Sequence, residues 1–136
     1  MAKNEIQDWA NEISAFCSEG QEHLSAEVAQ RARILYKRIV ALSPSPSFNV
    51  GGYSQGHFLK NYRIGARPQV GEIQGEEDTA QTFKRIDAQI PDDYFMANQT
   101  VTMTNSTSYI ADIEYKGWQR TPAYSPIAKA LAAELV

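Results

Sequence analysis

Cysteine is almost absent from this chain of 136 residues, which contains Cys17 alone. A single thiol excludes an internal disulfide and cannot provide a cysteine-rich zinc site. We therefore expect a protein that is made in the cytoplasm. The chain also lacks the run of about 20 apolar residues that a membrane-spanning helix needs. Its polar first residues, MAKNEIQDWANEI, do not resemble a signal peptide, so we expect no contact with a membrane.

Strong charge of one sign is lacking too, because 13 Lys and Arg face 16 Asp and Glu for a net charge of -3. A dedicated nucleic-acid surface normally needs a basic excess, so this balance argues against one. The phosphate-binding pattern GxxxxGK[ST] is absent, and no GxGxxG follows an expected strand. With 43% hydrophobic and 21% charged residues, the composition predicts one globular domain over residues 1–136.

The first 42 residues are expected to be helical. Apolar side chains recur every three or four residues and predict helices near 4–19 and 22–42, which can fuse into one. The first stripe comprises Ile6, Trp9, Ile13 and Phe16, and the second comprises Leu24, Val28, Leu35, Ile39 and Leu42. Cys17 lies beside Phe16 and is expected to pack as a small hydrophobe. Prolines after Ser43 end the pattern.

The rest of the chain predicts short strands and two further helices. We expect a loop at 43–56, a strand at 57–64, and a flexible arm at 65–78 with a short strand at 69–73. A helix near 79–89 follows, with Asp78 as its N-cap. After it we expect a strand within 94–105 that is strongest at 99–105, a strand at 109–115, and a helix at 125–136. The predicted class is α+β: a small antiparallel or mixed sheet over 57–124, packed against an N-terminal long helix pair and a C-terminal helix.

Candidate catalytic groups are few, and we predict no catalytic, metal-binding or cofactor-binding residues. Ser54 lies in GYSQG, which matches the G-x-S-x-G pattern of serine hydrolases. That motif must follow a strand and precede a helix, whereas here it follows a proline-rich loop and precedes an expected strand. A hydrolase that uses Ser54 with His57 or His23 is therefore an alternative that the sequence does not favour.

Aromatic side chains are more informative than the candidate catalytic groups. Trp118 is expected in a turn beside Arg120, and exposed Trp and Arg are enriched where subunits meet. In the other interpretation, Trp118 caps the core of its own domain. The candidates for subunit contacts are Tyr53, Phe58, Tyr62, Tyr115, Trp118, Arg120 and Tyr124.

Residues 35–132 contain a series of motifs in a recognisable order. A helix ends in a proline turn, and a glycine-bearing segment leads to the pair Asn61-Tyr62. Later come Asn105, the step Tyr109-Ile110-Ala111, the run Glu114-Tyr115-Lys116-Gly117, and a proline-bearing stretch before a final helix. This order resembles the tail-completion and neck proteins of tailed bacteriophages. Lys116 between the aromatic residue and the glycine departs from that pattern, as does Val50-Gly51-Gly52 where Thr-Gly is common.

The resemblance implies a non-enzymatic virion protein that forms a ring at the head–tail junction or caps the tail, without a cofactor. Six copies are favoured and twelve are the alternative, with DNA passing through the lumen without sequence-specific binding. The expected partners are other copies of the chain and the neck, connector or tail-tube proteins. The resemblance leaves tail terminator and neck protein as alternatives.

Four acids in the expected arm, Glu72, Glu76, Glu77 and Asp78, are predicted to face the lumen or a neighbouring ring. In the other interpretation they form a solvent-exposed loop without a partner. If the chain is a monomer before assembly, we expect the arm at 65–78 to be disordered alone. A soluble assembly adaptor or chaperone-like binding module is the alternative to the ring protein.

Overall fold

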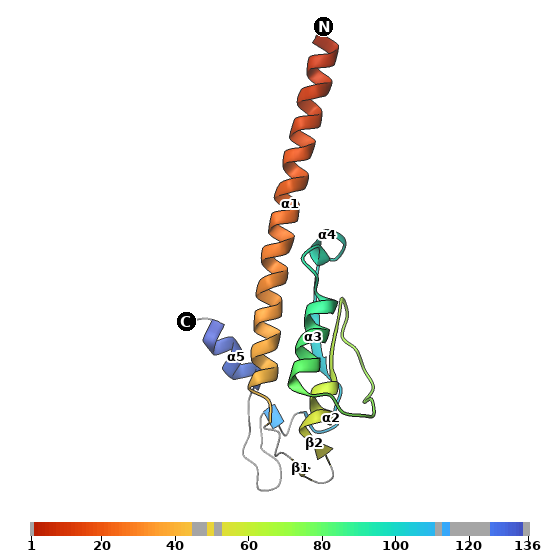
Figure 1. Ribbon diagram of the computed structural model, residues 1–136, viewed down its shortest axis with the longest axis vertical. Helices are drawn as coiled ribbons and strands as arrows, with labels where there is room; N and C mark the ends of the chain where they lie inside the picture. The colour runs from red at the N-terminus through yellow and green to blue at the C-terminus, as the bar shows by residue number, and fades with distance from the viewer. Residues whose placement is uncertain (1, 45–48, 51–52, 111–112, 115–125, 135–136) are drawn as a thin grey trace.

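A computed structural model describes residues 2–44, 49–50, 53–110, 113–114 and 126–134. It is an α+β structure, as the sequence predicts, dominated by one long N-terminal helix (Figure 1). Its elements are α1 (Ala2–Ala41), β1 (Asn49–Val50), β2 (Tyr53–Ser54), α2 (Gln55–Lys60), β3 (Tyr62–Gly65), α3 (Thr79–Gln89), α4 (Tyr94–Ala97), β4 (Thr102–Asn105) and α5 (Pro126–Glu134).

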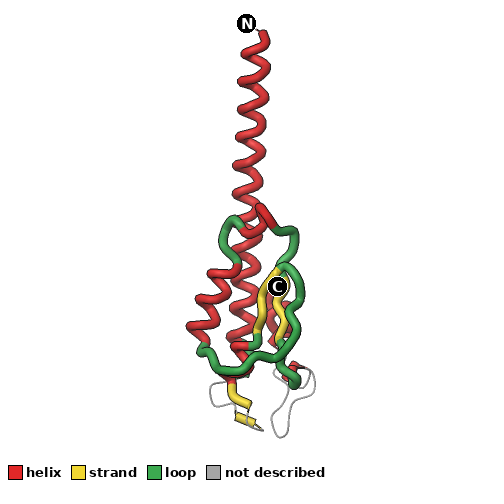
Figure 2. The backbone as a smooth tube through the Cα atoms, turned by 90° about the vertical axis from the view of Figure 1, so that its right-hand side faces the viewer, coloured by secondary structure: helices red, strands yellow, loops and turns green. Residues whose placement is uncertain are grey.

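The two expected N-terminal helices are one continuous helix, α1. Gly20 in its middle does not interrupt it, because a single helical glycine costs only about 1 kcal/mol. The helix ends where the prolines begin: the Ser43 hydroxyl donates a hydrogen bond of 2.9 Å to the Ile39 carbonyl, and Pro44 follows. The C-terminal half of α1 contacts α3, α4 and α5, whereas its N-terminal half extends beyond them (Figures 1 and 2).

The prediction of a strand at 57–64 is wrong over most of that segment. Residues 55–60 form helix α2, and strand β3 begins only at Tyr62. The reason is local: the Ser54 side chain accepts a hydrogen bond of 3.2 Å from the His57 amide and so caps the helix. Phe58 and Leu59 are adjacent in sequence and both fully buried, whereas a strand with one solvent-facing side would bury only one of the two.

Strand β3 pairs with β4 in an antiparallel ladder, from Tyr62 opposite Asn105 to Gly65 opposite Thr102. Strand β4 lies inside the segment expected to be strongest, but residues 94–97 of the longer prediction form helix α4 instead. The strand expected at 109–115 is also wrong, because Ile110, Ile113 and Glu114 are helical, with an amide-to-carbonyl hydrogen bond of 3.2 Å from Ile113 to Tyr109. A second ladder joins β1 to β2 within the segment expected to be a loop.

Helices α3 and α5 are confirmed close to the predicted limits. Asp78 caps α3, and its side chain accepts from the Gln81 amide while the Gln81 side chain accepts from the Asp78 amide. Helix α5 starts at Pro126, where a missing backbone donor is harmless. The buried carboxylate of Glu114 accepts hydrogen bonds from the first amides of α5, at Ile127 and Ala128.

The elements that pack together beside the C-terminal half of α1, namely α2–α5 and β1–β4, are called the body below. Residues 65–78, expected to be an arm, lie against this body, and the described stretch 69–73 contains no strand. The buried side chain of Asn61 holds this segment by pairing with the Ile73 backbone. Its amide donates to the Ile73 carbonyl at 3.0 Å, and its oxygen accepts from the Ile73 amide at 2.8 Å. Farther along, the Gln69 backbone pairs with the Thr104 hydroxyl of β4. The core itself consists of Ala29, Tyr36, Ile39, Val40, Phe58, Leu59, Tyr62, Ile64, Ile86, Ile90, Tyr109, Ile113 and Ala130.

Candidate functional site: the outward face of helix α1

Large exposed hydrophobic side chains of the described residues are concentrated on α1. Seven of the ten belong to this one helix and an eighth, Leu42, follows its last residue, so these exposed side chains form a surface and are not scattered. Phe16 is 76% exposed, and Ile6 and Trp9 are each 66% exposed. The eight are Ile6, Trp9, Ile13, Phe16, Leu24, Val28, Ile34 and Leu42; we call them the apolar stripe.

The stripe follows one side of α1 along the whole helix. Ile6, Leu24 and Leu42 are spaced 18 residues apart, as are Phe16 and Ile34. Eighteen residues make about five turns at 3.6 residues per turn, so these side chains point the same way. Gly20 also falls on this side and leaves a gap in the stripe.

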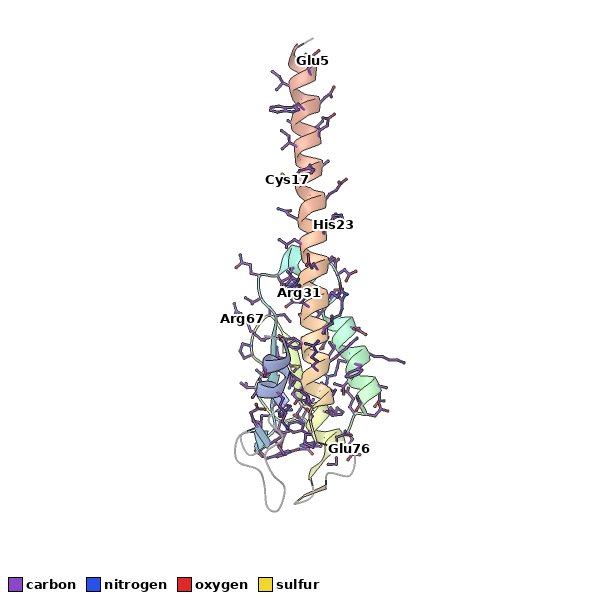
Figure 3. All side chains as sticks on the ribbon, turned by 90° about the vertical axis from the view of Figure 1, so that its left-hand side faces the viewer. Glu5, Cys17, His23, Arg31, Arg67 and Glu76 are labelled. Carbon is purple, nitrogen blue, oxygen red and sulfur yellow. The ribbon has the colours of Figure 1, made fainter. Side chains whose placement is uncertain are left out.

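That side faces away from the body. Trp9 and the fully buried Ala29 are 20 residues apart, as are Phe16 and the buried Tyr36. Twenty residues are about five and a half turns, which places the members of each pair on opposite sides of the helix. The body therefore leaves much of the stripe uncovered, above all its N-terminal members. Every residue from 5 to 24 is exposed, and Figure 3 shows Glu5 and Cys17 on a stretch of helix that no other element accompanies. The expectation that Cys17 packs is wrong, because its thiol is exposed.

Charge divides α1 into two halves. Residues 2–24 contain one basic and five acidic side chains, a net charge of -4, and residues 25–41 contain four basic and one acidic, a net charge of +3. In the described structure, the acids of the first half make no ion pair. In the second half Arg33 pairs with Asp92 at 2.8 Å and Lys37 with Asp87 at 2.7 Å, both toward the body. Arg31 pairs with Glu27 along the helix and is exposed.

Helix α4 is fixed to α1 at the level where the stripe leaves the body. The Ser25 hydroxyl donates to the Asp92 carbonyl at 2.7 Å and accepts from the Phe95 amide at 3.0 Å. Beside this contact is a hollow of about 480 Å³, lined among others by Leu24, Val28, Phe95 and Met96. Two stripe residues line this hollow, so the apolar surface widens here from helix α1 onto helix α4.

Two of the aromatic residues predicted for subunit contacts belong to the core instead. Phe58 is 0% and Tyr62 is 1% exposed, and their rings pack edge to face with centroids 5.3 Å apart. The Tyr62 hydroxyl shares a hydrogen bond of 2.6 Å with the Ser43 hydroxyl, and burial raises the pKa of Tyr62 far above its ordinary value. Tyr53 belongs to β2. The other four, Tyr115, Trp118, Arg120 and Tyr124, lie outside the described residues.

The four predicted acids have partners within the chain. Glu77 bonds to Arg85 at 2.8 Å and to the Thr82 hydroxyl at 2.6 Å. Partial burial raises the pKa of Glu77, but these hydrogen bonds and the charges of Arg85 and Lys60 outweigh burial and leave it lowered. Asp78 caps α3, Glu76 bonds to the Ser54 hydroxyl, and Glu72 accepts from the Ser108 amide at 3.1 Å. These acids hold the segment before α3 against the body.

Ser54, the nucleophile of the hydrolase alternative, caps α2 and bonds to Glu76. The His57 Nε2 atom lies 3.4 Å from the Glu72 carboxylate. His23 is on the exposed part of α1, away from Glu76 (Figure 3). Over the described residues, no group of three or more His, Cys, Asp or Glu side chains is placed to bind a metal, and no helix is long and apolar enough to cross a membrane.

Comparisons with known proteins identify no relative: no family model, curated protein or solved structure matches this chain. The candidate site therefore rests on the structure, in which the outward stripe of α1 is the most exposed apolar surface of the described residues. Sequence periodicity finds the two apolar stretches of the helix. It does not show that the first stretch lies opposite the core, although the 20-residue offset between Trp9 and Ala29 is a signal that could have been used.

Proposed function

We propose that this chain is a structural protein of a tailed bacteriophage, assembled from several copies at the head–tail junction or at the top of the tail. The observation that carries the proposal is the stripe of α1, which leaves large apolar side chains uncovered on the side away from the body. A helix that stands alone in water is marginally stable. A continuous surface of eight large exposed apolar side chains is typical of an assembly surface. The order of motifs over residues 35–132 adds the phage setting.

In this proposal the copies form a ring, with six favoured over twelve, and DNA passes through the lumen without sequence-specific contacts. The net charge of -3 suits such a passage, because a lumen that bound phosphates tightly would retain the DNA. The ring stacks on connector, neck or tail-tube proteins. All four acids make a hydrogen bond within the chain, but Glu72, Glu76 and Asp78 are exposed, so they are better candidates than the half-buried Glu77 to face the lumen or a neighbouring ring.

Negative-stain microscopy of the concentrated full-length chain tests the proposal. Closed particles with a central hole would support it and give the copy number. A field without rings at any concentration would contradict self-assembly into a ring and favour the adaptor. That alternative has its own support in the hollow beside α4, which offers one partner a concave contact lined by both apolar and polar side chains.

The hydrolase alternative has a separate test. A serine-reactive fluorophosphonate should not label Ser54, because its hydroxyl is held by Glu76 and by the His57 amide. Labelling that is lost in Ser54→Ala would favour the hydrolase over the structural protein.

A further inference from the structure

We propose that the exposed loop 66–72 of one copy, called the Val70 loop below, docks in the hollow beside α4 of the next copy, with Val70 against Leu24 and Met96. This inference rests on the proposed function and deepens it, because it names the two surfaces that meet between neighbouring copies. Loop and hollow are different surfaces of the chain, so the contact is heterologous and repeats from copy to copy. Such a series closes into a ring when the rotation between copies closes.

Val70 is the exposed large hydrophobic residue of the described structure that belongs neither to the stripe nor to the hollow. Of the ten such residues, eight form the stripe and Met96 lines the hollow, which leaves Val70 with 90% of its surface exposed. A single exposed apolar side chain is ordinary on a protein surface. Val70 differs from that ordinary case because the backbone that carries it is held in place.

The backbone is held on both sides of Val70. The Gln69 amide donates to the Thr104 hydroxyl at 3.3 Å, and this hydroxyl donates to the Gln69 carbonyl at 3.2 Å. The Arg63 guanidinium donates to the Gly71 carbonyl at 3.2 Å. Gly71 has a φ of 95°, which favours glycine, and turns the chain directly after Val70. A loop held in this way loses little conformational freedom on binding, so its projecting apolar side chain is suited to a contact.

The hollow beside α4 has the complementary shape. Its volume of about 480 Å³ is larger than one valine side chain, so neighbours of Val70 can enter with it. Leu24 is 63%, Met96 44% and Val28 39% exposed, and each therefore has apolar surface left to bury. The Ser25 hydroxyl fixes α4 to α1, so the hollow is formed before a partner arrives. Val70 does not line this hollow, so the two surfaces are separate on one copy.

The loop and the surroundings of the hollow carry opposite charge. Residues 61–71 contain two arginines and no acid, and among the described residues Arg67, at the outer edge of the body (Figure 3), makes no ion pair. Met96 also lines a second hollow, together with Glu22 and Asp93 among others. These two acids likewise make no ion pair among the described residues. A loop seated against Met96 therefore brings a basic side chain toward two acids.

Mixing two defective variants of the full-length chain tests the contact. Arg67→Glu/Val70→Glu removes the loop's side of it, and Leu24→Lys/Met96→Lys removes the hollow's side. Each variant alone should lose association and sediment as a monomer. An equimolar mixture should give a dimer and nothing larger in sedimentation velocity, because one intact loop and one intact hollow remain in each pair.

The matched control is Lys84→Glu/Ala88→Glu, which makes similar changes on exposed positions of α3 and should associate like wild type. A mixture that stays monomeric would overturn the contact, and so would a loop variant that associates like wild type with unchanged helical circular dichroism. A dimer in the mixture, together with open chains instead of rings from wild type, would support the contact and contradict the ring.

Cross-linking tests the same contact independently of charge. In a Cys17→Ser background, a Val70→Cys chain mixed with a Met96→Cys chain should form a disulfide-linked dimer under mild oxidation. Neither chain should link by itself, because the contact joins unlike surfaces. Linkage of the Val70→Cys chain alone would show that two loops meet, and no linkage in the mixture would show that loop and hollow do not meet; either result would overturn the proposal.

Discussion

Replacing Asn61 with alanine should cost this small domain a large part of its stability. The side chain is fully buried and makes three hydrogen bonds to backbone atoms: one to the His57 carbonyl and two to Ile73. Asn61→Ala removes all three and leaves the Ile73 amide and carbonyl without these partners. An unsatisfied polar group costs about 1–3 kcal/mol when buried, and Ile73 is only half-buried, so we expect a loss of about 2–4 kcal/mol.

Urea denaturation followed by circular dichroism measures this loss. Asn98→Ala is the matched control, because Asn98 makes one local side-chain hydrogen bond, of 2.9 Å, to the Tyr94 carbonyl; its cost should stay near 1 kcal/mol. Hydrogen exchange should also quicken around Ile73 in Asn61→Ala and not in the control. Equal losses of stability in the two variants would refute the role of Asn61 as the clamp that holds residues 65–78.

Three further predictions concern acid, alkali and glycine. The pKa of Glu77 is lowered in the folded chain, so the stability that its carboxylate contributes is present above its ordinary pKa and is lost as pH falls through the folded pKa. Glu77→Gln should therefore lower the free energy of unfolding by about 1–2 kcal/mol at pH 7, and stability should then depend less on pH in the acid range. The pKa of Tyr62 is raised, so stability should fall as pH rises above about 10, and Tyr62→Phe should remove most of that fall in alkaline urea titrations. Gly20 has open space around it, so Gly20→Ala should stabilise the folded chain by up to about 1 kcal/mol in thermal melts. Gly56→Ala should destabilise it, because the added Cβ would lie 2.9 Å from the Glu76 Cβ. A change of the same sign in both variants would contradict this reasoning.

Features with a local cause could be predicted from the sequence. The capping box of Asp78 and Gln81 needs only neighbouring residues, and α3 begins there. Pro126 at the start of α5 and the proline turn after α1 are local signals of the same kind. The α+β class follows from these helices and from the β-prone run that contains β4, so it too was within reach of the sequence.

Features that depend on distant contacts could not be predicted. Phe58 and Leu59 are both buried because α2 packs between β3 and α3, which no pattern within residues 57–64 reveals. Tyr109 ends in the core beside Phe58, so its segment turns as a helix rather than extending as a strand. Only part of the candidate site could be predicted from the sequence. The sequence identifies the apolar residues of α1, but the side on which the body packs is decided by Ser25, Ala29 and Tyr36 together with their partners.

The mass of the full-length chain in solution tests the central claim most directly, that the outward face of α1 is an interface between copies. Sedimentation equilibrium over a wide concentration range should give a species heavier than a single 15.2 kDa chain, with Trp9→Glu/Phe16→Glu shifted toward one copy. Fluorescence of the 66% exposed Trp9 should move to shorter wavelength as copies associate. A wild-type chain that keeps the mass of a single copy at every concentration would contradict the claim.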